Sequence, residues 1–304
     1  MTTRRLLAST AVGIFLAILT LPAFAVAFTP ALDEFWIIKN GQEIFRDSFD
    51  SGAPPPDGPD GATTYSVFGP GGITSEAGGK LTMTPSLGGP VAITTTFADT
   101  VTSGVRSLST NSANANFLGY GDSFEIHGLY DMSSLPAISG QSFGIRASDR
   151  ATGIGNEGDN TYYLFVGKSD LSGNIVVALR LQDFEANTST LIDVDSIESL
   201  LPTADQVEFI LSKAADSDLL TASYVLYDVS DATVGSGALG TAGGTCSAMG
   251  VTGPCPPLQI YLGEDYIRAQ FISTDQVPVP EPATLALLGV ALAGLGFSRH
   301  RKLH

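Results

Sequence analysis

The sequence predicts an all-β protein built as an antiparallel β-sandwich, and three observations support this. Between residues 28 and 276, short stretches rich in β-branched and aromatic residues recur along the chain. They are separated by turn-forming residues, and the 304-residue chain contains 34 Gly and 17 Pro. No convincing helical pattern lies between these stretches. Strands that follow one another without helices favour packed antiparallel sheets over a helix-covered parallel sheet.

We expect strands wherever an apolar or alternating stretch is bounded by turn signals. Their predicted ranges are 34–39, 43–49, 64–68, 80–84, 91–97, 123–130, 141–148, 161–167, 175–184, 189–194, 206–212, 221–229, 258–262 and 266–273. The one stretch that tolerates a helix, 197–201, is short and ends at Pro202.

The clearest strands alternate apolar and polar residues. Phe124, Ile126 and Tyr130 alternate with Glu125 and His127, which predicts one buried face and one face in water. Similar alternation runs through 142–147 and 207–212.

Two other stretches, 162–166 and 175–181, are apolar at nearly every position, so we expect them inside a sheet and not at its edge. Trp36, the single tryptophan, is expected in the core. The proline-rich stretch 51–63 is interpreted as a surface loop, because the segment before it is too short to form a domain of its own. We therefore expect one sandwich domain over 28–276.

The N-terminal end has the pattern of a secretory signal peptide. Arg4 and Arg5 precede an apolar run over 6–21, and small residues follow at Ala23 and Ala25. We expect a signal peptide over 1–25 for the Sec route, with cleavage after Ala25 or, in a second register, after Ala27. An uncleaved membrane anchor is the alternative.

The C-terminal segment, 277–302, has three parts in order. Pro280, Glu281 and Pro282 are followed by an uncharged apolar stretch over 283–297 and then by the basic residues Arg299, Arg301 and Lys302. As a helix the apolar stretch spans roughly 22 Å, which is short of the roughly 30 Å hydrocarbon core. The basic cluster nevertheless suits the cytoplasmic side of a membrane, so we expect a transmembrane segment at 283–297.

This three-part tail resembles the PEP-CTERM sorting signal of Gram-negative bacteria. The resemblance implies recognition and processing near Pro280–Glu281–Pro282 by a membrane enzyme, the exosortase. It further implies transient anchoring in the inner membrane, followed by a place on the cell surface or in an extracellular matrix or biofilm, often in bacteria that make exopolysaccharide. It implies nothing about the chemistry of the middle domain. An ordinary tail anchor is the alternative.

The charge distribution argues against nucleic acid as a partner. The formal net charge is −16, and five of the 15 Lys and Arg residues lie in the two end segments. The region between them is therefore more acidic than the whole chain, and it lacks the basic face that phosphates require.

Two cysteines, Cys246 and Cys255, are expected to form a local disulfide in an oxidising compartment. Between the two end segments His127 is the only histidine, which excludes most metal and Ser–His–Asp chemistry. Ser142 lies in a Gly-x-Ser-x-Gly match, but a strand follows it and His127 precedes it, so we assign no catalytic residue.

The order of strands resembles a concanavalin A-like jelly roll of the laminin-G or legume-lectin type. The points of similarity are the leading strand around Phe45–Asp50, the long strands from 123 to 229, and the closing strand at 266–271. In such folds a polar sheet face binds glycans. The resemblance therefore implies a binding face for exopolysaccharide or another surface glycan, and an ordinary wet face is the alternative. The expected face consists of Glu125, His127, Arg146, Arg180 and Gln182.

A carbohydrate-active hydrolase or lyase on the same fold is the alternative function. Asp193, Asp195 and Glu198 resemble the catalytic strand of family-16-type glucanases, although Asp193 stands where that pattern has Glu. Glu125 is the other carboxylate that such an enzyme would use.

Calcium is the one ion for which the sequence offers ligands. Asp47 with Asp50, the loop 156–160, and Asp216 with Asp218 are the places for a structural calcium ion. Solvated turns are the alternative at all three.

Overall fold

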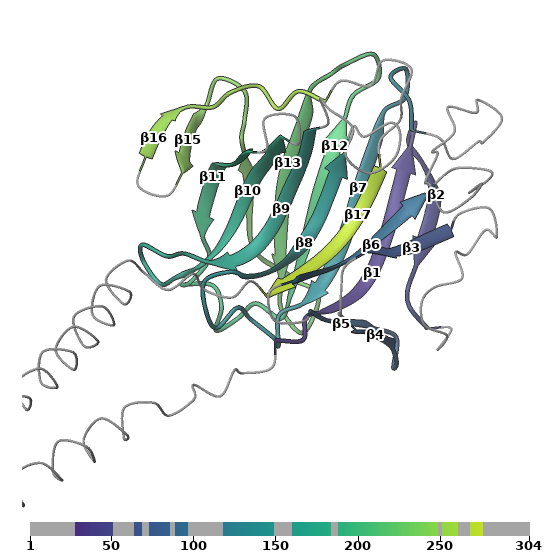
Figure 1. Cartoon of the computed structure of the whole chain (residues 1–304), viewed down its shortest axis with the longest axis vertical. Coiled ribbons are helices and arrows are strands. Elements are labelled where there is room, and N and C mark those ends of the chain that lie inside the picture. Colours follow the sequence, from purple (N-terminus) through teal and green to yellow (C-terminus); the bar gives the residue numbers. More distant parts are fainter. Residues whose placement is uncertain are drawn as a thin grey trace, which may run out of the picture.

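The computed structural model describes residues 28–50, 64–68, 73–85, 89–96, 118–148, 160–183, 188–248, 251–260 and 268–275. These residues form an all-β structure in which two antiparallel sheets lie face to face (Figure 1). The predicted antiparallel sandwich is thereby confirmed at the level of its class.

The larger sheet has eight strands in the order β14–β13–β12–β7–β1–β5–β4, and β2 also pairs with β1. Their bounds are β1 Ala31–Lys39, β2 Gln42–Asp47, β4 Ile73–Glu76, β5 Leu81–Thr84, β7 Phe124–Asp131, β12 Gln206–Lys213, β13 Leu220–Tyr227 and β14 Thr233–Leu239.

The second sheet has seven strands in the order β11–β10–β9–β8–β17–β6–β3. Their bounds are β3 Thr64–Phe68, β6 Gly89–Thr96, β8 Gln141–Ser148, β9 Asn160–Lys168, β10 Ile175–Asp183, β11 Thr188–Ser196 and β17 Arg268–Asp275. A small hairpin of β15 Thr245–Ala248 and β16 Val251–Pro254 stands beside β11 (Figure 1).

Most expected strands are present with ends shifted by a few residues, but β4, β14, β15 and β16 were not expected. These strands are short or contain glycine and proline, so they lack the apolar alternation that marks the others. The strand expected at 258–262 is not formed over 258–260, where Gln259 makes an isolated bridge to Leu219. Residues 197–201, which tolerate a helix, form turns.

The core lies between the inner faces of the two sheets, and aromatic rings occupy its centre. The ring of Tyr130 in β7 lies 5.0 Å from that of Phe143 in β8 and 5.6 Å from that of Phe209 in β12, measured between centroids. The inward-facing residues of these strands are as predicted, because Phe124, Ile126 and Tyr130 are buried and belong to this core. The predicted face in water is wrong for His127, which is buried, and for β8, where Ser142 on the outer face is buried as well.

A hydrogen bond joins the two sheets at the centre of the core. The hydroxyl of Tyr130 donates to the backbone carbonyl of Gly144 across the interface, at 2.7 Å. Burial raises the pKa of Tyr130 well above its ordinary value, so the hydroxyl keeps its proton and remains a donor. Glycine is also needed at Gly128, because a Cβ there would come within 2.6 Å of the Ile145 side chain.

Strands β9 and β10 lie inside the seven-stranded sheet, as their uniformly apolar sequences predict. Their inner faces contribute to the core. On the outer face a second apolar cluster forms, and its buried members are Tyr163, Phe165, Val176, Ala178 and Ile272. This sheet is therefore apolar on part of both faces.

The two end segments lie outside the described residues, and so do the surface loop 51–63 and the cleavage positions Ala25 and Ala27. This applies equally to the expected signal peptide at 1–25 and the expected transmembrane segment at 283–297. Within the described part of the chain, no helix has the length and apolar character needed to cross a membrane.

The backbone at Gly144 yields a stability prediction. A Cβ at this position would lie 2.1 Å from the carbonyl oxygen of Leu164, and a backbone atom cannot move aside as a flexible side chain can. Gly144→Ala is expected to lower the free energy of unfolding by at least about 2 kcal/mol, measured by urea denaturation. Gly253→Ala, whose Cβ would meet no atom within 4 Å, is the control. Equal stabilities of the two variants would contradict the prediction.

Candidate functional site

The five residues of the expected glycan-binding face lie on two different sheets. Glu125 and His127 are in β7 of the eight-stranded sheet, whereas Arg146 in β8 and Arg180 and Gln182 in β10 belong to the seven-stranded sheet. The expectation that all five share one face is therefore wrong. Alternation within a strand shows which residues point outward, but it does not reveal that the chain changes sheet between β7 and β8.

On the outer face of the eight-stranded sheet, His127 lies between two carboxylates. Its Nδ1 is 2.8 Å from Glu208 Oε1 and its Nε2 is 3.0 Å from Glu125 Oε2. In the imidazolium form both ring nitrogens donate, whereas the neutral ring donates from one alone. The contact with Glu208 connects β7 to β12, whereas Glu125 belongs to β7 itself.

Trp36 lies beside this histidine, and its expected place in the core is wrong. The β1 register pairs Trp36 with His127 of β7 on one side and with Arg46 of β2 on the other. The imidazole stacks at 4.6 Å with an interplanar angle of 12°, and the guanidinium lies 4.7 Å from the indole centroid. Because both neighbours contact the ring, Trp36 offers no open aromatic platform for a sugar.

The charges of this face are paired within the protein. Arg46 forms ion pairs with Glu34 and Glu43, and these carboxylates satisfy its guanidinium. Burial raises the pKa of Glu208, but hydrogen bonds from His127 and from the Tyr227 hydroxyl, at 2.6 Å, lower it, and the pKa falls below its ordinary value. The face therefore has little unsatisfied charge with which to hold a ligand.

The outer face of the seven-stranded sheet is different, because two arginines flank an aromatic residue across three strands. Arg146, Tyr163 and Arg180 are direct cross-strand neighbours in β8, β9 and β10. The Arg146 guanidinium lies 4.7 Å from the Tyr163 ring centroid, and that of Arg180 lies 5.3 Å from the Phe165 centroid. The two rings stack on each other at 4.4 Å.

A cavity of about 170 Å³ opens at this row. The Ser142 hydroxyl lies 3.0 Å from the Tyr163 hydroxyl and 2.8 Å from the Thr274 hydroxyl, so it belongs to a network of three hydroxyl groups. The lining also includes Arg146, Phe165, Val176, Arg180 and Gln182, with Lys168 and Asp170. We refer to it below as the arginine cavity.

The two arginines of this cavity form no ion pair with any residue that the structure describes. By contrast, Lys39, Arg46 and Lys80 contact carboxylates, and Lys168 and Lys213 donate to backbone carbonyls. Burial, together with the nearby positive charge of Arg180, lowers the pKa of Arg146 to about 10. The Arg146 Nε and the Gln182 Oε1 are buried without a hydrogen-bond partner.

Sequence reasoning identified Arg146, Arg180 and Gln182 but missed Tyr163, Phe165, Ser142 and Thr274 as parts of the same site. The uniformly apolar character of 162–166 was the available signal. It placed aromatic rings on the outer face of the sheet, but it did not show that the arginines of neighbouring strands stack on them.

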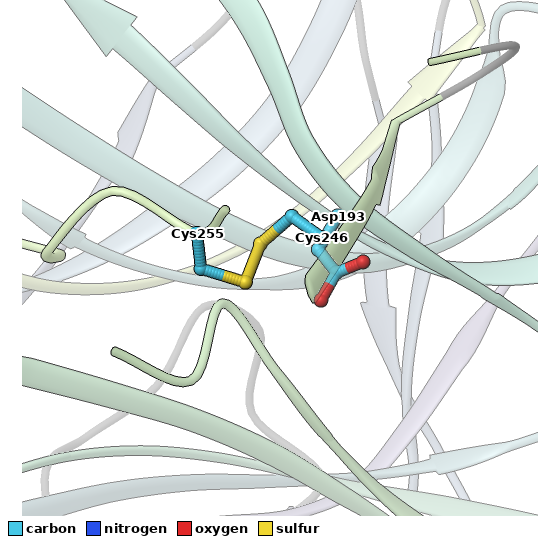
Figure 2. A group of neighbouring side chains, drawn as sticks. All are labelled: Asp193, Cys246 and Cys255. Carbon is cyan, nitrogen blue, oxygen red and sulfur yellow. A yellow bond between two sulfur atoms is a disulfide. The ribbon is translucent and has the colours of Figure 1, made fainter. Parts of the chain in front are cut away.

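At the β11 edge of the sheet, next to β10, Cys246 and Cys255 form a disulfide beside the buried carboxylate of Asp193 (Figure 2). The two sulfur atoms are bonded to each other, so this trio is no metal site. Asp193 instead accepts three backbone N–H bonds, from Ser247 at 2.7 Å and from Val194 and Gly240 at 2.9 Å. It thereby ties β11 to the loop that leads into β15.

The other two acids of the glucanase-like stretch also hold the structure together. Asp195 accepts a 2.5 Å hydrogen bond from the Tyr224 hydroxyl of the opposite sheet, and Glu198 accepts one of 2.7 Å from the Ile175 backbone. Burial first, and then Asp195, raise the pKa of Tyr224.

The described calcium candidates do not gather into a group of three ligands. Asp47 caps its own turn by accepting from the Phe49 N–H at 2.9 Å, as turn-forming aspartates do. Among the residues that the structure describes, one group of three possible metal ligands lies close together, and it consists of Asp193, Cys246 and Cys255. Asp50, Asp216 and Asp218 do not belong to it. Residues 156–159 lie outside the described part.

The His127–Glu208 contact predicts acid sensitivity. Because the folded-state pKa of Glu208 lies below its ordinary value of 4.5, its contribution to stability is present above that value and is lost as the pH falls through the lower one. Glu208→Gln is expected to cost about 1–2 kcal/mol at neutral pH and less near pH 3, measured by urea denaturation at both. Glu125→Gln, at the exposed side of the same ring, is the control. A cost that does not shrink in acid would contradict this.

Comparisons with known proteins add little about the sandwich itself. A search of curated proteins finds no match. Among solved structures, the chain is similar to the CBM2 module of the evolved Dit of Lactobacillus casei BL23 phage J-1. The identity is 9%, the TM-score is 0.37, and the match covers 80% of this chain and 89% of that one. A TM-score this low does not establish a common fold.

The C-terminal segment matches a known family model. Residues 278–302 fit the model of the PEP-CTERM protein-sorting motif, and they include Glu281 and the three basic residues that the sequence singled out. This motif implies processing by an exosortase, with export and transient membrane anchoring before release at the surface. The chain carries a PEP-CTERM protein-sorting motif.

Proposed function

We propose that this protein is a surface or matrix component that binds exopolysaccharide or another surface glycan through the outer face of its seven-stranded sheet. The observation that carries the proposal is the arginine cavity, where the Arg146 Nε and the Gln182 Oε1 are buried polar atoms that lack partners and Arg180 also lines the wall. Buried polar groups normally have hydrogen-bond partners. A polyhydroxylated ligand would supply them.

The fold and the end segments have matching roles in this proposal. The sandwich over 28–276 is a concanavalin A-like jelly roll with a structural and adhesive role, the segment 1–25 is a signal peptide for the Sec route, and 277–302 anchors the chain through a helix at 283–297. In this arrangement the sandwich reaches the outside of the cell. The basic residues Arg299, Arg301 and Lys302 remain on the cytoplasmic side until an exosortase acts.

A carbohydrate-active enzyme on the same fold is the weaker alternative. Asp193, Asp195 and Glu198 each accept structural hydrogen bonds, and Glu125 contacts His127. A glycosidase needs two carboxyl groups that face each other across a groove, and these four acids are engaged elsewhere. We therefore place the binding function first.

Glycan binding is tested by retention of the full-length chain, purified in detergent, on immobilised exopolysaccharide from the cells that produce the protein. Arg180→Ala is expected to weaken retention at least about tenfold, because it removes hydrogen-bond donors from the cavity. The control is Arg46→Ala, which removes an aromatic-stacked arginine from the other sheet. Equal retention of both variants would exclude the cavity. Release of sugar by the parent protein would favour the enzyme.

Sorting is tested in the native cells with Glu281→Gln. The expected outcome is a larger, unprocessed product that stays in the membrane fraction, whereas the unaltered protein appears in the surface or medium fraction at reduced size. Immunoblotting of both fractions measures this. Asp205→Asn, an exposed change far from the motif in sequence, is the control. Normal processing of the Glu281 variant would refute the role of this glutamate.

A further inference from the structure

We propose that the ligand of the arginine cavity is the acid group of an anionic glycan, a carboxylate or a sulfate held between Arg146 and Arg180. This inference rests on the proposed glycan-binding function and narrows it to one chemical class. It depends on three features of the cavity: cations without acid partners, guanidinium groups fixed in place by stacking, and a size that suits one sugar.

Among the described residues, Arg146 and Arg180 contact neither a carboxylate, as Arg46 and Lys80 do, nor a backbone carbonyl, as Lys168 and Lys213 do. Asp and Glu outnumber Lys and Arg by 31 to 15, so a cation on the surface has carboxylates available nearby. Within the described part, Arg46 contacts two glutamates and Lys80 contacts two aspartates. Arg146 and Arg180 lie on the two sides of Tyr163 with no such partner among the residues that the structure describes. Two like charges held close together are costly unless an anion neutralises them.

Stacking prepares the two guanidinium groups for this anion. Each lies over an aromatic ring, Arg146 on Tyr163 and Arg180 on Phe165, and the two rings are themselves stacked. A ring contacts the flat face of a guanidinium group, whereas the N–H donors lie along its edge. The edges are the groups that bind carboxylates and other oxyanions in a fork-like, bidentate manner. The Arg146 Nε, buried without a partner, is one such donor.

The neighbouring polar groups suit the rest of an acidic sugar. The Ser142 and Thr274 hydroxyls line the cavity beside Tyr163, and the Gln182 Oε1 is a buried acceptor without a donor. The cavity of about 170 Å³ is smaller than typical sites for drug-sized molecules, which measure roughly 300–1,000 Å³. It therefore suits a single acidic sugar unit within a polymer.

The net charge of −16 makes this inference specific. A strongly acidic protein repels polyanions at long range, so general electrostatic attraction does not account for retention on an acidic polymer. Any preference for acidic over neutral polymers has to come from a local cationic site. Arg146 and Arg180 form such a site.

The experiment compares polymers that differ in charge alone. The full-length chain in detergent is passed over immobilised polygalacturonate, fully methyl-esterified polygalacturonate, dextran sulfate and dextran. Retention on at least one acidic polymer is expected to exceed that on its neutral counterpart at least about tenfold. The acidic polymer that retains the protein identifies the acid group as carboxylate or sulfate.

Variants assign the preference to the cavity. The double variant Arg146→Gln and Arg180→Gln is expected to abolish the preference for the acidic polymer. Arg46→Gln, which removes one stacked arginine from the other sheet, is expected to leave it unchanged. Thermal unfolding checks that each variant is folded. If the double variant does not fold, the inference is decided by two other measurements. One is the polymer comparison with the unaltered protein, and the other is the single variant Arg180→Lys, which keeps the charge but loses the fork-shaped donor.

The outcomes separate the two proposals. Equal retention on acidic and neutral polymers would overturn the acid-group inference and leave glycan binding in place. If the protein is retained neither on any of the four polymers nor on the exopolysaccharide of the native cells, the acid-group inference and the glycan-binding proposal are both overturned. A preference that survives in the double variant would place the acid-binding site elsewhere and overturn the inference.

Discussion

The close contact between β7 and β8 in the middle of the sandwich is the constraint on which the rest of the structure depends. Tyr130 reaches from one sheet to the backbone of the other, and its hydroxyl finds its acceptor at Gly144. The aromatic rings of Phe143 and Phe209 pack around it. Without this satisfied hydrogen bond, a buried hydroxyl would oppose the burial of the surrounding apolar surface.

Because the two inner faces pack so tightly, specific chemistry is left to the two outer faces, and these differ. On the eight-stranded sheet, His127 and Arg46 each contact two carboxylates of the protein itself. On the seven-stranded sheet, an apolar cluster supports two arginines that have no acid partner among the described residues. A face that satisfies its own charges stabilises the protein, whereas one that leaves them unsatisfied is suited to bind a ligand.

The carboxylates that the sequence offered for catalysis serve the fold. Asp193 joins β11 to the segment that carries the disulfide, and Asp195 joins β11 to Tyr224 of the opposite sheet. Both lie on β11, the edge strand of the seven-stranded sheet, which pairs within the sheet only with β10. The resemblance of this stretch to a catalytic strand is therefore matched by a structural role for each of its acids.

The sequence by itself determined the class of the fold, the faces of the best strands and the sorting motif, because alternation and ordered motifs are local features. Only the tertiary structure decided which strands share a sheet. The segment from 132 to 140 carries the chain from one sheet to the other, and nothing in the period of two records this change. Glu125 and His127 were thereby separated from Arg146 and Arg180, and Trp36 was placed beside His127, because cross-strand register depends on contacts distant in sequence.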